Sequence, residues 1–261
     1  MGTGDVLKFA FHAVRRYPKT LLPAVLSWIP VTAAVLLTAL ALSELSLAGL
    51  LQSAGSPQAL LQLLAVLGPS LLFLAILFLV SGAFLQAFYV DVTSQFAKHK
   101  KPDISSAFYV AKRNLLPVLW VQAIIGILIF AVVAAVVIVS VVFRGILAST
   151  ADNLAFLASL FAVLYVQTKT WMAVTSVVLE KKRGWSAVKR SFALSKGRFA
   201  EILFIILTIS IATSIVNTVF DTIPFAGAVL TLLASLFFTV WTYTAPAAFY
   251  FEYRLGKKSI K

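Results

Sequence analysis

Residues 153–199 read NLAFLASLFAVLYVQTKTWMAVTSVVLEKKRGWSAVKRSFALSKGRF, a long apolar run followed by a strongly basic segment. Its first part, Asn153–Leu179, is long and apolar enough for one membrane helix, which needs about 20 residues. Seven Lys and Arg residues follow between Glu180 and Phe199. Because Lys and Arg beside apolar spans stay on the cytoplasmic side, the stretch predicts a membrane helix that ends inside the cell.

The same alternation continues along the whole chain. Twenty of the 22 basic residues fall into four clusters, within 8–19, 98–113, 181–198 and 254–261, and long apolar stretches separate them. If every cluster is cytoplasmic, each stretch crosses the bilayer an even number of times. The sequence therefore predicts six transmembrane helices: Leu21–Ser43, Leu60–Val90, Leu115–Phe143, Asn153–Leu179, Phe199–Phe220 and Phe225–Phe251. We expect one integral membrane domain, residues 1–261, in the cell membrane with both termini cytoplasmic.

The three predicted hairpins resemble one another. AFHAVRRYPKTLLPAVL, from Ala10, and AFYVAKRNLLPVLW, from Ala107, precede two of them, and the weaker GWSAVKRSFALSKGRF, from Gly184, precedes the third. An acid ends each hairpin: Asp91, Glu180 and Glu252. The fold class is thus an all-α polytopic membrane protein of three hairpin repeats, approximately 4–97, 103–183 and 184–257, each beginning with a short amphipathic cytoplasmic helix. Chance similarity between apolar segments is the alternative.

Each short cytoplasmic helix combines an apolar stripe with a basic face. In the third, Trp185, Val188 and Phe192 form the stripe. Such helices lie in the membrane interface, where bases attract anionic lipid head groups. The candidate anionic-lipid contacts are Arg15, Arg16, Lys112, Arg113, Lys189, Arg190 and Lys196. Alternatively, these bases only set the topology and pair with nearby acids.

Composition excludes several classes of function. The chain is 61% hydrophobic and only 12% charged, and its net charge of +13 lies in loops beside membrane helices, so membrane lipids are expected partners and nucleic acids are not. A protein partner in the membrane is possible from this pattern but is not identified by it. The chain has no Cys, only His12 and His99, and no phosphate-binding or serine-hydrolase motif. We expect no cofactor, no metal site and no enzymatic activity.

Lys169 is the sharpest exception to the apolar pattern. It lies eleven residues before Glu180, which in a straight helix places it about 16 Å from the inner surface. An ionisable residue at that depth suggests a functional site by default. The repeats place polar residues of other helices at the same depth, so we predict an intramembrane polar pocket containing Gln86, Gln167, Lys169, Tyr243 and Thr244. The alternative is a Lys169 buried for packing or extended to the interface.

One segment resembles a known family. Residues 177–199, VVLEKKRGWSAVKRSFALSKGRF, are similar to a loop of uncharacterised six-helix inner-membrane proteins of bacteria and archaea, related to the membrane domain fused to some glycerophosphodiester phosphodiesterases. The matching positions are Glu180, Gly184, Ala187, Arg190, Ser191, Lys196 and Gly197. The resemblance implies a six-helix membrane fold and brings no assigned activity, because no phosphodiesterase barrel accompanies it.

Two hypotheses of function follow. In the first, the chain is a non-enzymatic membrane organiser or accessory subunit that interacts with inner-leaflet lipids. In the second, it carries or binds a lipid or small amphiphile through the intramembrane polar pocket. We favour the first, because secondary transporters more often consist of two inverted halves than of three parallel hairpins.

Overall fold

The structure is a computed structural model that describes residues 18–27, 57–98, 100–147, 150–223 and 227–255, together with residues 8, 12, 29 and 32. All regular structure in this part of the chain is helical. The elements are η1 (Pro18–Leu21), α4 (Pro57–Ala97), α5 (Ile104–Leu147), α6 (Thr150–Thr170), α7 (Ala173–Glu180), α8 (Trp185–Leu194), α9 (Phe199–Asp221) and α10 (Gly227–Leu255).

Five segments of the described helices are long and apolar enough to cross a membrane. They are Gly68–Ala97, Ile104–Val142, Asn153–Glu180, Phe199–Asp221 and Val229–Phe251. These segments overlap the second to sixth predicted spans, and the prediction of an all-helical, multi-pass membrane protein is confirmed at this level. The first predicted span, 21–43, lies largely outside the described residues, so the arrangement of six helices in three repeats stays a prediction.

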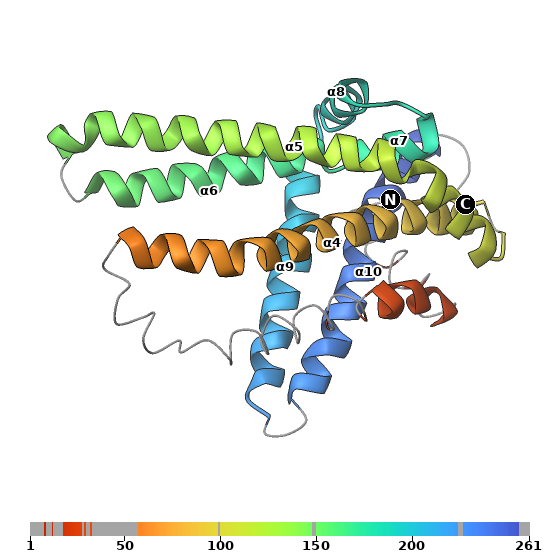
Figure 1. Cartoon of the computed structure of the whole chain (residues 1–261). Helices are drawn as coiled ribbons and strands as arrows, with labels where there is room; N and C mark the ends of the chain where they lie inside the picture. Colours follow the sequence, from red (N-terminus) through yellow and green to blue (C-terminus); the bar gives the residue numbers. More distant parts are fainter. Residues whose placement is uncertain are drawn as a thin grey trace.

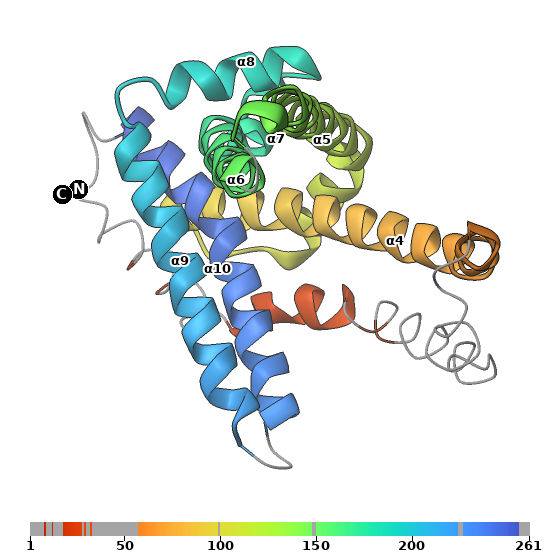
Figure 2. The ribbon, with the colours of Figure 1, turned by 90° about the vertical axis from the view of Figure 1, so that its left-hand side faces the viewer.

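Two helical hairpins and α4 make up the bundle. Helices α5 and α6 form one hairpin, α9 and α10 form the other, and the two hairpins point in different directions (Figures 1 and 2). Helix α4 packs against α5 and also against α10, so it joins the two hairpins. The short α8 lies against α5, α6 and α7, where the two hairpins meet.

The packed core lies where the hairpins meet, in a region that we call the root: residues 83–94, 107–121, 166–195 and 236–251. It contains fully buried large side chains such as Phe88, Tyr89, Val118 and Phe249. Beyond the root, large apolar side chains are exposed on every long helix: Leu72, Phe130, Phe161, Ile215 and Leu233. In a soluble protein so much exposed apolar surface would be unfavourable, whereas the acyl chains of a bilayer cover it without cost.

The three short helices predicted to precede the hairpins differ from the prediction in the structure. The second is not separate: residues 107–113 are continuous with the long helix α5, which also includes Pro117 without ending there. The third is present as α8, and its apolar stripe is divided: Val188 is fully buried and Phe192 packs against the root, whereas Trp185 is 47% exposed. The first lies mainly outside the described residues.

Candidate functional site

The predicted fourth span is interrupted near its end at Glu180, ahead of the basic loop. Helix α6 ends at Thr170 and α7 begins at Ala173. The break frees backbone groups, and Ser191 of α8 binds two of them: its hydroxyl accepts a hydrogen bond from the Met172 amide at 3.1 Å and donates one to the Lys169 carbonyl at 2.7 Å. Because buried backbone groups require partners, the fully buried Ser191 stabilises the break.

Glu180 closes the other end of α7. The Arg190 guanidinium donates hydrogen bonds to both carboxylate oxygens, from Nε at 2.9 Å to Oε2 and from a terminal nitrogen at 3.0 Å to Oε1. The Tyr250 hydroxyl of α10 also donates to Oε1, at 2.8 Å. The Glu180 side chain is only 9% exposed, whereas that of Arg190 is 39% exposed. Glu180 therefore ties α7 to both α8 and α10.

The loop between α7 and α8 depends on a glycine. Gly184 has φ 51° and ψ −131°, a backbone conformation that residues with a Cβ rarely adopt. A Cβ at this position would lie 3.1 Å from Nε1 of Trp120 on α5. Glu180, Gly184, Arg190 and Ser191, four positions of the family resemblance, thus fix the geometry of the helix break and of α8. A structural role accounts for them.

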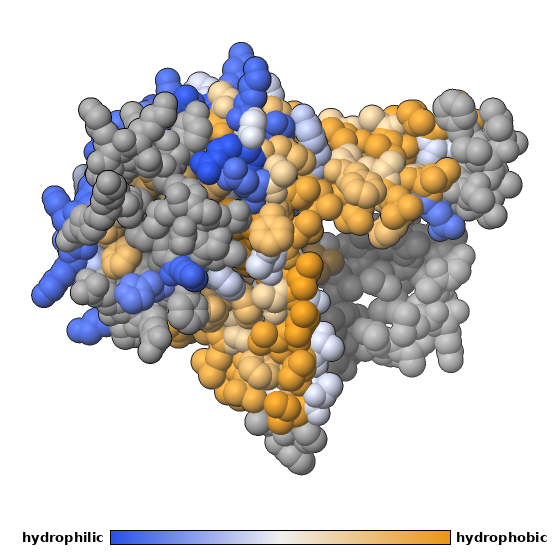
Figure 3. Space-filling model, turned by 180° about the vertical axis from the view of Figure 1, so that it is seen from behind, coloured by the Kyte–Doolittle hydropathy of each residue, from blue (hydrophilic) through white to orange (hydrophobic). Residues whose placement is uncertain are grey.

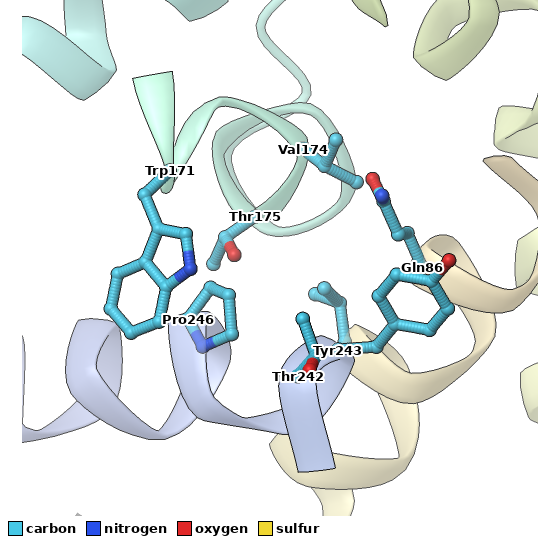
Figure 4. Close-up of a pocket in the computed structure, with 8 residues that line it drawn as sticks. Gln86, Trp171, Val174, Thr175, Thr242, Tyr243 and Pro246 are labelled. Carbon is cyan, nitrogen blue, oxygen red and sulfur yellow. The ribbon is translucent and has the colours of Figure 1, made fainter. Parts of the chain in front are cut away.

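The helix break forms one wall of a cavity of about 90 Å³ between α4, α7 and α10 (Figure 4). One water molecule requires only about 10–15 Å³ of such space. None of the eight lining side chains is charged, and five of them carry hydrogen-bonding groups. The lining residues are Gln86, Val90, Trp171, Val174, Thr175, Thr242, Tyr243 and Pro246.

Thr175 is the most unusual group in this wall. The residue is fully buried, and its Oγ1 has no hydrogen-bond partner among the described residues. Thr168 is equally buried but satisfied, because its hydroxyl donates to the Leu164 carbonyl at 2.7 Å. Figure 4 shows Thr175 on the side of α7 that faces Pro246 of α10. An unsatisfied hydroxyl beside open space is a binding group for water or a ligand.

A short chain of polar side chains crosses the bundle beside the cavity. The Gln122 amide of α5 donates to the Gln86 carbonyl oxygen of α4 at 3.2 Å, and Gln86 also interacts through its side chain with the Tyr243 hydroxyl of α10. The Tyr243 ring stacks on Tyr89, with ring centroids 6.4 Å apart. On its other side Tyr243 lines a second cavity, of about 170 Å³, together with Ser81 and Gly82.

Gln86 and Tyr243, two members of the predicted pocket, both line the cavity of about 90 Å³. Lys169 does not line it. The Lys169 ammonium instead lies 5.7 Å from the ring centroid of Tyr165 and 5.4 Å from that of Phe199, at the start of α9. The predicted position of Lys169 in one pocket with Tyr243 and Thr244 was inferred from a straight helix. The break after Thr170 removes that assumption, and the aromatic rings provide a favourable site for the cation.

The other two members also lie apart from the cavity lining. Gln167 is exposed on α6. Thr244 is buried on α10, where its hydroxyl donates to the Trp241 carbonyl at 3.1 Å. The pocket proposed from sequence thus separates into a cavity around Gln86 and Tyr243 and a distinct aromatic site around Lys169.

Hydrophilic residues gather on one side of the molecule (Figure 3), and exposed Lys and Arg residues form a group among them. We call the exposed members of this group the basic end: Lys98, Lys100, Lys101, Lys112, Arg113, Lys181, Lys182, Arg183, Lys189 and Lys196. Four of the predicted lipid contacts, Lys112, Arg113, Lys189 and Lys196, belong to it. Arg190 is half-buried and binds Glu180, while Arg15 and Arg16 lie outside the described residues.

Thr175 and Gln122 were not among the residues predicted from sequence to form the site. Each is a polar residue within an apolar run, and this signal can be seen in the sequence. It was weak, because hydroxyls in membrane helices usually bind the preceding turn of their own helix, as Thr168 does. Only the packing of α7 against α4 and α10 shows that Thr175 differs.

Comparisons with known proteins give no family assignment. No protein-family model matches the chain, and neither the curated proteins nor the solved structures contain a significant match.

Proposed function

We propose that this chain is a non-enzymatic membrane organiser or accessory subunit that binds anionic inner-leaflet lipids through its basic end. The observation that carries the proposal is the position of the basic end beside the apolar bundle. Lys112 and Arg113 are exposed on α5, whereas the adjacent Ala111 is fully buried in the root. The charges of Lys112 and Arg113 therefore lie on the outer surface of a helix that is packed into the root.

Few acids compensate these charges. Among the described acids, Glu180 binds Arg190, Glu201 binds Arg198, and Asp91 lies close enough to Lys98 to interact with its charge. Lys189 and Lys196 remain exposed on and just after α8. Each basic residue near an anionic membrane surface contributes about 1 kcal/mol of attraction. Val188 and Phe192 pack α8, and with it this charge, against the bundle, while Trp185 stays exposed.

Retention of phosphatidylglycerol by the full-length protein tests the proposal. Purified protein would be titrated with this lipid in neutral detergent at low salt. Replacing Lys112, Arg113, Lys189 and Lys196 with Gln should weaken binding by up to about 4 kcal/mol, and added salt should reduce the difference. Arg190 is left unchanged because of its structural pairing with Glu180.

The matched control exchanges Lys for Arg and Arg for Lys, so that each position keeps its positive charge. Lys112→Arg, Arg113→Lys, Lys189→Arg and Lys196→Arg, combined in one protein, should bind the anionic lipid like the wild type. If the Gln variant retains phosphatidylglycerol as well as this control does, the basic end serves only to orient the chain in the membrane, and the proposal is wrong.

A further inference from the structure

We infer that the cavity between α4, α7 and α10 binds the uncharged, hydroxyl-bearing head group of a membrane amphiphile, with Thr175 as its main hydrogen-bond partner. The site is separate from the basic end and takes a different kind of ligand. Its chemistry follows from its walls, its unsatisfied hydroxyl and the surface to which it opens.

The walls select a neutral ligand. The cavity is lined by Gln, Thr, Tyr and Trp together with Val and Pro, without a charged side chain. An ionised head group transferred into such a site would lose its hydration without gaining a counter-charge. A hydroxyl, by contrast, both donates and accepts a hydrogen bond.

Thr175 provides the polar contact that the protein leaves unmade. Its buried Oγ1 has no partner within the described part of the chain, although it can donate one hydrogen bond and accept others. Gln86 and Tyr243 lie on the opposite wall and offer further polar groups. A head group with more than one hydroxyl can therefore bind both walls at once.

The cavity reaches the outer surface of the helix bundle. Thr175 is fully buried, whereas Thr242, which lines the same cavity, is exposed, and Trp171 and Pro246 are half-buried between them. All the lining residues lie within the membrane-compatible segments 68–97, 153–180 and 229–251. The opening is therefore toward lipid, which favours an amphiphile that enters sideways with its acyl chain left in the bilayer.

A monoacylglycerol is a suitable probe. Full-length protein in neutral detergent would be titrated with 1-oleoylglycerol, with methyl oleate, which lacks free hydroxyls, and with oleoyl lysophosphatidic acid, which is charged. Binding would be followed by intrinsic Trp fluorescence, since Trp171 lines the cavity. We expect saturable binding of 1-oleoylglycerol at least tenfold tighter than that of methyl oleate.

Two threonine variants locate the site. Thr175→Val removes the unsatisfied hydroxyl at constant shape and should weaken binding of 1-oleoylglycerol about tenfold, the effect of one hydrogen bond in a buried site. Thr168→Val is the control, because it is equally buried but lies outside the cavity lining. It should bind like the wild type. Tyr243→Phe, a second variant in the wall, should also weaken binding.

The inference is overturned if methyl oleate binds as tightly as 1-oleoylglycerol, if the charged probe binds more tightly at this site, or if Thr175→Val leaves the affinity unchanged. Absence of saturable binding would mean that the cavity holds water only, and would also overturn it. The Gln variant of the basic end should bind 1-oleoylglycerol normally. The two sites are thereby tested independently.

Discussion

The Ser191 hydroxyl donates a hydrogen bond to the backbone carbonyl of Lys169, 22 positions earlier in the chain, over 2.7 Å. With the hydrogen bond that it accepts from the Met172 amide, Ser191 provides partners for two backbone groups at the helix break. The break in turn separates α6 from α7 and lets α7 present Thr175 to the cavity. A polar side chain of the short α8 thus determines the geometry of an intramembrane site.

Ser191→Ala should destabilise the protein by about 2–4 kcal/mol, because two buried backbone groups lose their partner at once. The measurement is thermal or denaturant unfolding in a fixed detergent. Ser195→Ala is the matched control, since Ser195 is equally buried but donates only a local hydrogen bond to the Phe192 carbonyl. Equal losses in both variants would contradict a special role for Ser191.

Gly184→Ala should also destabilise the protein, by about 1–3 kcal/mol, because Ala must adopt the unfavourable φ of 51° beside the Trp120 indole. Gly126→Ala in α5 is the opposite case: open space surrounds the position, and Ala should be neutral or stabilise the helix by up to about 1 kcal/mol. Unfolding midpoints of both variants test the pair. A neutral Gly184→Ala would show that the loop readily changes conformation.

The Glu180 carboxylate and the Tyr250 hydroxyl should be energetically coupled. Tyr250→Phe removes one charge-assisted hydrogen bond and should cost about 1.5–3 kcal/mol, and Glu180→Gln should cost a similar amount, since Arg190 is partly solvated. In the double variant the losses should be less than additive by about 0.5–3 kcal/mol. Strict additivity in the double-mutant cycle would mean that the two groups act separately.

Lys169→Met should leave binding of 1-oleoylglycerol unchanged, because Lys169 does not line the Thr175 cavity. It should lower stability by no more than about 2 kcal/mol, through loss of the contacts with Tyr165 and Phe199. The same titration and unfolding measurements apply. Loss of ligand binding in this variant would restore the pocket around Lys169 that the sequence suggested.

Membrane topology can be tested with single cysteines in this Cys-free chain. We expect Asn153→Cys and Thr222→Cys, at the ends of the hairpins away from the basic end, to react with an impermeant reagent in whole cells. Ala193→Cys, exposed on α8, should react only after the membrane is opened. The reverse pattern would place the basic end outside the cell.

Local sequence patterns predicted the long helices well. A membrane span is a property of about 20 consecutive residues, and the five described spans overlap runs that the sequence marks by hydrophobicity and flanking charge. Whether the helix continues without a break through an apolar run was less predictable. Pro117 lies inside a continuous helix, whereas the break at Trp171–Met172 contains no proline.

The membrane class and the positions of the described spans could be predicted from the sequence alone, because hydrophobic length and flanking charge are local properties of the chain. Tertiary structure decided which polar residues meet. Gln86 joins Gln122 and Tyr243, and Lys169 turns to aromatic rings, because helix crossings set these contacts. Thr175 became a candidate ligand group only when α4, α7 and α10 packed around it and left its hydroxyl without a partner among the described residues.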